Sequence, residues 1–512
     1  MQWKVWVAIV AASFWPGAAQ AAWFEASSEH FVIYADDSEK DITQFAEQLE
    51  RYHSGMARAL GSQLPVPSPS NRVTIYVVNS EREVRTIYGE GSRYVGGFYV
   101  PRAGGSLAII PPVHSSTGDA TITMIPLLHE YAHHFLISTS STAMPRWLSE
   151  GAAEFFATSR FDKDGSLWLG RAAQHRAGEL FFAADVTASD LLDPEQYERR
   201  KHGGYDAFYG RSWLLYHYLS FDPARRGQLS RYLDLLRAGA GQREAAEEAF
   251  GGLQKLDRDM DLYLKKGRMT ALQFPADSLH VGTITVRALG AGEAAILPVQ
   301  IRSKRGVGTE DAPALLTDAK AIAARFPGDP AVLSALAEAA YDAGDDKAAI
   351  AAADAAIALD PRQVNAYVQK GYALFRIAQG VQGAQDRPAA FKAARVPFVA
   401  LNHLENDHPL PLVYYYRSFL EQGMKPPALA VQGLIRAVEL APFDQGLRMD
   451  LGYAFLRLGR SEEARDALTL VANDPHGGAL SEKARGLIAH IEADPKWDGH
   501  EDASAAAASS GG

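Results

Sequence analysis

The chain has 512 residues, with 51 Lys and Arg against 61 Asp and Glu, so its net charge is -10. This acidic balance argues against nucleic-acid binding through a basic surface, and the length predicts two or three domains. The sequence contains no cysteine, which excludes disulfides, thiolate catalysis and cysteine-ligated metal sites. Any metal must therefore be held by His, Asp or Glu.

Residues 1–21 have the pattern of an export signal. Lys4 precedes an apolar run at residues 5–15, and residues 19–21 fit a small-x-small cleavage site. We expect cleavage after Ala21 and export, consistent with a bacterial periplasm. The alternative is an uncleaved membrane anchor, although the run is short for a bilayer span. No later run approaches about 18 apolar residues, so no transmembrane segment is expected after cleavage.

The periodicity of residues 22–275 predicts an α+β domain. Strands are expected at 31–34 and 73–78, a hairpin from 93–100 and 106–110, and a helix over 41–60. From Asp119 to about Lys266 the pattern is helical. Residues 276–310 are expected to form a small β-rich linker module, with strands at 281–286 and 294–301.

Residues 311–495 are alanine-rich and repetitive. Segment 371–376 (GYALFR) echoes 452–457 (GYAFLR), and small residues recur seven apart, as in Ala349 with Ala356 and Ala430 with Ala437. Helix ends are marked by Asp360-Pro361, Ala441-Pro442 and Asp474-Pro475.

This pattern resembles tetratricopeptide repeats and implies an all-α solenoid with a concave face for protein partners. An ordinary alanine-rich helical domain is the alternative. Residues 379–411 are either an insertion or a degenerate repeat. Residues 496–512 are expected to be a disordered tail, because the segment 503–512 contains only Ala, Ser and Gly.

One segment carries the clearest chemical signal, His129-Glu130-x-x-His133. On a helix, positions four apart share a face, so both imidazoles can reach one metal ion. Glu130 would project beside them, where it can take a proton from water at the metal. Apolar neighbours on both sides suit a buried active-site helix.

Two histidines do not complete a zinc site, and a third ligand is sought downstream. Glu150 lies 17 residues beyond His133, a spacing that allows a turn and a second packed helix. Glu154, one helical turn later, would hydrogen-bond a ligand histidine and fix its tautomer. If Glu150 is not the third ligand, Glu154 is the next candidate.

Together, His129-Glu130-x-x-His133 and Trp147-Leu148-Ser149-Glu150-Gly151-x-Ala153-Glu154 resemble the gluzincin metallopeptidases, in particular the bacterial peptidase-MA-like group. The resemblance covers roughly residues 23–270 and implies a zincin-like fold with a mixed sheet and active-site helices. It also implies Zn²⁺ held by His129, His133 and Glu150, with Glu130 as general base. The aminopeptidase N family is more remote, because the spacer is shorter and its signature for a free amino terminus is missing.

The same resemblance extends to residues 209–216 and implies that Tyr209 stabilises the oxyanion, with Tyr205 as the alternative. A plain aromatic packing stripe would also explain Tyr209. The resemblance also implies that the strand at 93–100, with Gly96 and Gly97, pairs with the substrate backbone. A plain hairpin with a glycine bulge is the alternative. His134 is expected to pack or support the site. Isolated structural or surface roles are expected for His114, His175, His202 and His217.

The favoured hypothesis is an exported zinc-dependent peptidase that hydrolyses peptide bonds through a zinc-bound water, with repeats that recruit a protein substrate or partner. The alternative is a catalytically silent periplasmic scaffold that works through its repeats. A third interpretation is a chance motif that binds no metal.

Overall fold

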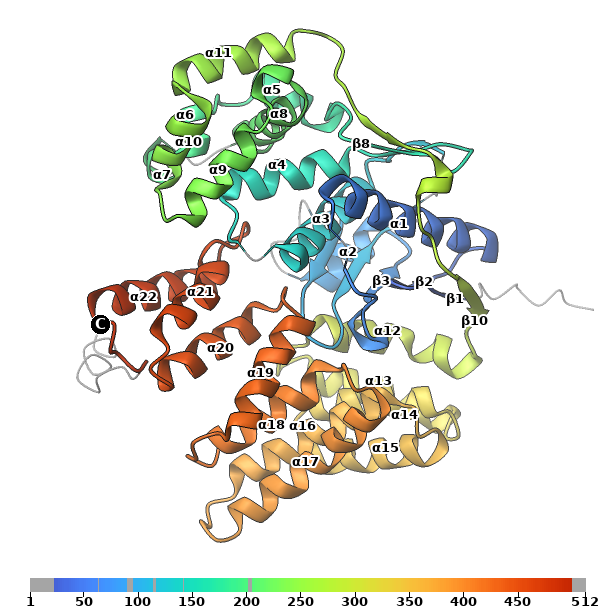
Figure 1. Ribbon diagram of the computed structural model, residues 1–512. Helices are drawn as coiled ribbons and strands as arrows, with labels where there is room; N and C mark the ends of the chain where they lie inside the picture. The colour runs from blue at the N-terminus through green and yellow to red at the C-terminus, as the bar shows by residue number, and fades with distance from the viewer. Residues whose placement is uncertain are drawn as a thin grey trace, which may run out of the picture.

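The computed structural model describes residues 23–62, 64–89, 95–113, 117–140, 142–200 and 205–499 (Figure 1). The expected export signal, most of the expected tail, His114, His202 and the start of the 93–100 strand lie outside the described residues. Within the described ranges, no helix has both the length and the apolar character needed to cross a membrane.

Among the described residues, a six-stranded mixed sheet organises the N-terminal part. The three central strands, β2 (Phe31–Ala35), β3 (Val73–Val77) and β5 (Leu107–Ile110), are parallel to one another. The remaining strands pair antiparallel with their neighbours. The predicted strands at 31–34 and 73–78 are confirmed, as is the hairpin, in which Phe98 pairs with Ile109. The spatial order is β10 (Thr285–Ala288), β1 (Phe24–Ser27), β2 (Phe31–Ala35), β3 (Val73–Val77), β5 (Leu107–Ile110) and β4 (Phe98–Val100).

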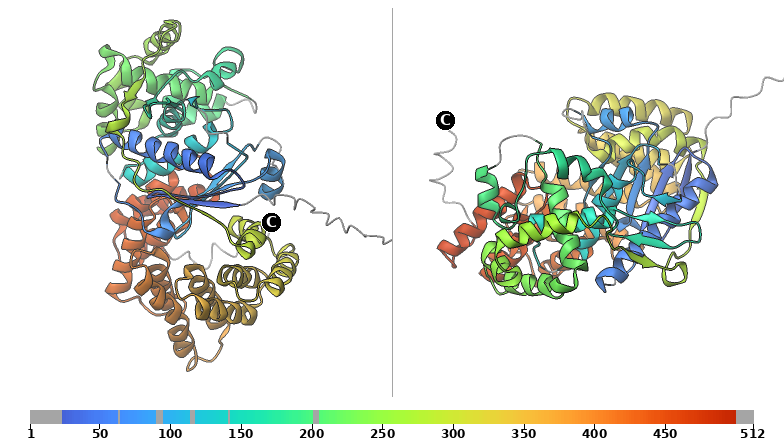
Figure 2. Two further views of the ribbon diagram at one scale, coloured as in Figure 1. Left: turned by 90° about the vertical axis from the view of Figure 1, so that its right-hand side faces the viewer. Right: turned by 90° about the horizontal axis from the view of Figure 1, so that it is seen from above.

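Each face of this sheet is covered by helices, because side chains alternate between the faces along each strand. Ile33 and Ile75 face the larger core with helices α1 (Glu39–Leu60) and α3 (Ile125–Thr139). Tyr76 and Ile109 face the other side, against α2 (Glu81–Tyr88) and α12 (Ala291–Arg305). Figure 2 shows the sheet nearly edge-on in its left view, with α1 on one side and the solenoid on the other.

The stretch predicted to be helical from Asp119 to Lys266 is interrupted by short strands. β6 (Gly118–Asp119), β7 (Arg160–Phe161), β8 (Leu167–Leu169) and β9 (Leu272–Phe274) form a small antiparallel sheet over α1. Two- and three-residue strands are too short for a period-2 signal. The helices are α4 (Arg146–Ala157), α5 (Ala177–Phe182), α6 (Ala188–Leu192), α7 (Pro194–Arg200), α8 (Phe208–Phe221), α9 (Gln228–Arg237), α10 (Gln242–Phe250) and α11 (Leu253–Leu264).

The β-rich linker module predicted at 276–310 is wrong in its second half. Residues 285–288 do form strand β10, but the predicted strand at 294–301 is the middle of helix α12. Leu297 and Ile301 pack on the sheet, whereas Ile296 and Val299 pack on the following helices. A helix buried on two sides loses its amphipathic period, so its apolar run resembles that of a buried strand.

The C-terminal part is a curved stack of antiparallel helix pairs, as the repeat pattern predicts (Figure 1). Ala349, Ala356, Ala430 and Ala437 are fully buried between helices. The stack begins with α12 and continues through α13 (Ala312–Arg325), α14 (Pro330–Asp342), α15 (Asp346–Leu359), α16 (Val364–Gly380), α17 (Arg387–Leu404), α18 (Pro409–Leu420), α19 (Ala428–Leu440), α20 (Gln445–Arg457), α21 (Ser461–Ala472) and α22 (Ala479–Ala493).

The structure favours one of the two alternatives for residues 379–411, and it shifts the boundary expected at residue 495. Residues 379–411 contain α17, which pairs with α16, so this segment is a repeat with long helices and not an insertion. At the other boundary, Trp497 stacks on His490 with ring centroids 5.0 Å apart. Ordered packing therefore continues past residue 495.

The solenoid is docked on the N-terminal part along its length. Its first helix, α12, covers one face of the sheet. Further along, the backbone N–H and the hydroxyl of Ser70 both donate to Glu405, and the N–H of Ala103 donates to Asp444 Oδ2 at 2.8 Å. The last helices return to the side of α3 (Figure 1). These contacts place the end of the repeats beside the motif helix.

Candidate metal centre

Helix α3 presents both motif histidines to the interior. Its core side chains Leu128 and Phe135 are fully buried, and the Tyr52 hydroxyl donates to the Leu128 carbonyl at 2.9 Å. His129 and His133, one turn apart, are also buried, and their Nε2 atoms lie 3.1 Å from each other. His129 and His133 therefore lie on one face of the helix, as predicted.

Helix α4 supplies the third group. Glu150 is fully buried, and its Oε2 lies 3.3 Å from Nε2 of both His129 and His133. Ligands about 2.0–2.1 Å from a tetrahedral zinc ion are separated from each other by about 3.3 Å, so this donor set fits zinc. The other carboxylate oxygen, Glu150 Oε1, is buried without a hydrogen-bond partner among the described residues. The three ligand atoms form the one such His/Asp/Glu group found in the described part of the chain.

Glu154 stands behind His129 and does not converge with the other donors. Its Oε1 lies 3.1 Å from His129 Nδ1, on the side of the ring opposite the Nε2 atom that faces the other donors. The carboxylate is itself held by His175 Nε2 at 2.6 Å and by Arg176 Nη2 at 2.5 Å. His175 is therefore structural but not isolated, because its side chain holds Glu154, which lies beside His129.

The electrostatics of the cluster favour positive charge between the carboxylates. Burial opposes a charge on His129, but Glu150 and Glu154 outweigh it and raise the pKa of His129 to about 10. Burial also opposes ionisation of Glu150, yet both imidazoles lower the pKa of that carboxyl well below its usual range. Burial lowers the pKa of His133, with Glu150 acting in the opposite direction. A divalent cation would satisfy the same two carboxylates.

Glu130 faces a cleft and not the core. The cleft has a volume of about 730 Å³ and is lined by residues 97–100, by Glu130 and His133, and by residues 474–477 of the solenoid. The Glu130 side chain is 29% exposed, and its Oε2 lies 3.6 Å from His476 Nε2. Burial raises the pKa of Glu130, but His476, His129 and His133 outweigh it, so that the pKa is lowered overall and the carboxylate is ionised.

The edge strand β4 forms one wall of this cleft. Its Tyr99 hydroxyl lies 2.6 Å from His134 Nδ1, and the His134 ring packs on Phe443 of the solenoid with centroids 4.4 Å apart. His134 therefore has the packing role expected of it.

Tyr209, near the start of α8, lies at the edge of the metal centre. Its ring centroid is 6.4 Å from that of His129, and the Arg176 guanidinium stacks on it at 4.8 Å. Burial raises the pKa of Tyr209, so the phenol remains protonated and able to donate. Tyr205, the alternative, is 66% exposed. The geometry brings Tyr209, and not Tyr205, to the centre.

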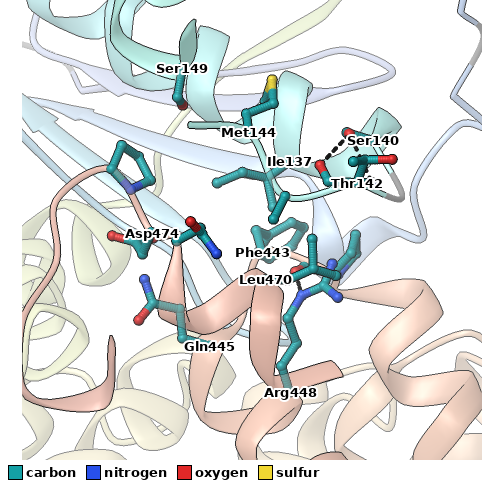
Figure 3. A pocket seen from close by; sticks show the side chains of 14 residues that line it. Ile137, Ser140, Thr142, Met144, Ser149, Phe443, Gln445, Arg448, Leu470 and Asp474 are labelled. Atoms are coloured by element: carbon teal, nitrogen blue, oxygen red, sulfur yellow. Dashed lines mark hydrogen bonds between the residues drawn. The ribbon is translucent and has the colours of Figure 1, made fainter. Parts of the chain in front are cut away.

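The connection between α3 and α4 also rests on the solenoid. Figure 3 shows Ile137 and Met144 facing Phe443 and Leu470 across a small cavity that Ser149 also lines. The Ser149 hydroxyl lies 3.2 Å from His133 Nδ1. The solenoid thus packs on the loop that connects α3 and α4.

No protein-family model and no curated protein matches the sequence. Solved structures with similarity include TTC0263, a TPR protein of Thermus thermophilus, at 16% identity and a TM-score of 0.34, covering 38% of this chain and 100% of that one. MamA of Desulfovibrio magneticus (residues 41–end) gives 19% identity and a TM-score of 0.28 over 39% and 98%. Yeast Tom70 is 13% identical, with a TM-score of 0.26, and the match covers 71% of this chain and 69% of that one.

Proposed function

We propose that the chain is a zinc-dependent peptidase whose metal is held by His129, His133 and Glu150. The observation that carries the proposal is the convergence of three buried donor atoms at 3.1–3.3 Å beside a carboxylate that opens into a cleft. A chance motif would not bring Glu150 from a second helix to the same point. Zinc bound there would act as a Lewis acid toward water and a scissile carbonyl.

Residues of the chain supply the remaining catalytic and positioning roles. Glu130 accepts the proton of the attacking water and returns it to the leaving nitrogen. The Tyr209 hydroxyl donates a hydrogen bond to the oxygen that gains charge. The edge strand β4 offers backbone groups to an extended substrate lying in the cleft. Glu154 holds His129 through Nδ1. The expected substrate is a peptide or protein segment, and the expected location, after removal of residues 1–21, is outside the cytoplasm.

The test uses purified chain from residue 22 onward, with zinc content and hydrolysis of casein and of a mixed pool of quenched fluorescent peptides. About one zinc per chain is expected in the wild type, lost in His129→Ala and Glu150→Gln. Glu130→Gln should keep the zinc and lose hydrolysis. His403→Ala, an exposed change on α17, is the control.

The contrary results are distinct. Zinc lost only in His129→Ala would remove Glu150 from the ligand set. A wild type that takes up no zinc after reconstitution, or a Glu130→Gln variant that hydrolyses normally, would end the peptidase proposal.

A scaffold role is the second candidate, and one feature of the solenoid favours it. A hollow of about 370 Å³ is lined by Tyr341, Tyr372, Tyr414 and Tyr453, with Arg376 and Arg417 among them. Such an aromatic surface suits a protein segment. Partner capture that survives Glu130→Gln but not Tyr372→Ala, with a wild type that hydrolyses nothing, would favour this role.

A further inference from the structure

Two neighbouring turns of the solenoid contact the motif helix at equivalent positions. In the turn between α19 and α20, Phe443 follows Pro442 and packs on His134. In the turn between α21 and α22, His476 follows Pro475, and its ring centroid lies 5.0 Å from that of His133. The repeat spacing thus places two successive post-proline residues against the adjacent histidines His134 and His133 of α3.

The second of these turns is held in one conformation by its own hydrogen bonds. The Asp474 carboxylate accepts from the N–H of His476 at 2.9 Å, and the Asp474 carbonyl accepts from the N–H of Gly477 at 3.1 Å. Gly477 and Gly478 follow with φ of 66° and 102°, values that favour glycine. His476 is therefore presented to the cleft by a defined turn.

The geometry argues against two other roles for His476, those of a metal ligand and of a cover over the cleft. His476 is not among the three converging donors, so it does not complete the metal ligand set. It does not seal the cleft either, because its side chain is 49% exposed and about 730 Å³ stays open beside Glu130. Its polar contact in the cleft is Nε2 to Glu130 Oε2, at 3.6 Å.

We propose that His476 is a positioning residue of the active site, supplied by the last helix pair of the solenoid. Its Nε2–H directs one oxygen of Glu130, and the other oxygen is left to accept the proton of the attacking water. The inference rests on the proposed peptidase function and deepens it, because the general base on α3 and the group that orients it come from different domains. The solenoid is then part of the active site as well as a recruiting surface.

The first test compares two replacements of the same residue. His476→Phe keeps a ring for packing but has no donor, whereas His476→Gln keeps an N–H near the position of Nε2. With the peptide pool above, His476→Phe is expected to lower kcat about tenfold with little change in KM, and His476→Gln to recover most of the loss. Zinc content should stay at the wild-type level, and His403→Ala should match the wild type.

Three results would overturn the inference. Wild-type kcat in both variants would show that His476 does nothing for Glu130. A raised kcat in both variants would show that His476 covers the site and restricts access to it. Equal loss in both, together with zinc loss, would show a structural role alone.

A second readout does not depend on turnover. A peptide hydroxamate binds zinc and hydrogen-bonds the adjacent carboxylate, so its affinity for zinc-loaded protein, measured by calorimetry, reports the orientation of Glu130. His476→Phe should weaken binding several-fold, and His476→Gln less, relative to Glu130→Gln as the reference for a disabled base. Unchanged affinity in His476→Phe would contradict the inference even if no substrate is cleaved. Failure of the peptidase proposal itself would appear separately, as normal hydrolysis by Glu130→Gln.

Discussion

Gly151 of α4 lies so close to α8 that a methyl group at its position would be 2.4 Å from the carbonyl oxygen of Ser212. This contact involves backbone and cannot be relieved by a side-chain rotation. Because Gly151 directly follows Glu150, the same close approach sets how far the Glu150 carboxylate reaches toward His129 and His133. The glycine of the second motif is therefore explained by helix packing.

Gly151→Ala should force α4 away from α8. Overpacking of this kind costs about 1–3 kcal/mol of unfolding free energy, and zinc affinity should fall because Glu150 moves with the helix. Urea unfolding of the zinc-free protein and chelator competition measure the two effects. Gly486→Ala on α22, where nothing lies within 4 Å of the added methyl, is the control and should be neutral or stabilising. Equal behaviour of the two variants would refute the packing explanation.

Glu154→Gln should weaken zinc binding without abolishing it. The carboxylate holds His129 Nδ1 from behind, and loss of such a partner typically costs about 10–100-fold in metal affinity. Competition with a fluorescent zinc chelator measures the zinc affinity. Glu195→Gln on α7, where the side chain is 88% exposed, serves as the matched control. Complete loss of zinc would instead make Glu154 a ligand.

Tyr209→Phe should lower kcat by about 100-fold, because removal of one oxyanion donor costs this order, with zinc content unchanged. Tyr205→Phe should have no effect, since its side chain is 66% exposed. Steady-state kinetics on the peptide pool checks both. A loss in Tyr205→Phe with none in Tyr209→Phe would reverse the assignment.

His217 should make folding sensitive to acid. It is fully buried, its Nδ1 lies 2.8 Å from the Tyr263 hydroxyl, and burial lowers its pKa from 6.5 to about 4. Between these values the unfolded chain binds a proton that the folded chain does not, so stability is present at neutral pH and falls as the pH falls. The shift corresponds to about 3 kcal/mol.

Urea unfolding at pH 7 and pH 4, followed by tryptophan fluorescence, measures this loss. His217→Gln should be less stable at pH 7 but should lose correspondingly less on acidification. An identical pH slope in the variant and the wild type would rule out His217 as the source.

The convergence of His129, His133 and Glu150 could be predicted from the sequence because its signals are local. The spacing of His129 and His133 follows from helix geometry, and Glu150 follows from the motif one helix later. The roles of His175 and His476 were not readable, because they depend on contacts between distant segments that no periodicity records. His476 lies 346 residues after Glu130 in the chain. Helix α12 could not be predicted for a related reason, because burial on two sides removes the amphipathic periodicity that indicates a helix.

That double burial of α12 has a practical consequence for dissecting the molecule. A free-standing repeat array ends in helices with a polar outer face, but here the first helix turns Leu297 and Ile301 toward the sheet. Excision of the repeats with α12 would expose this apolar surface to water, and excision without it would uncover Leu315 and Val332 of the next helices. Either fragment would tend to aggregate, so the two halves are best separated by point substitutions in the intact chain.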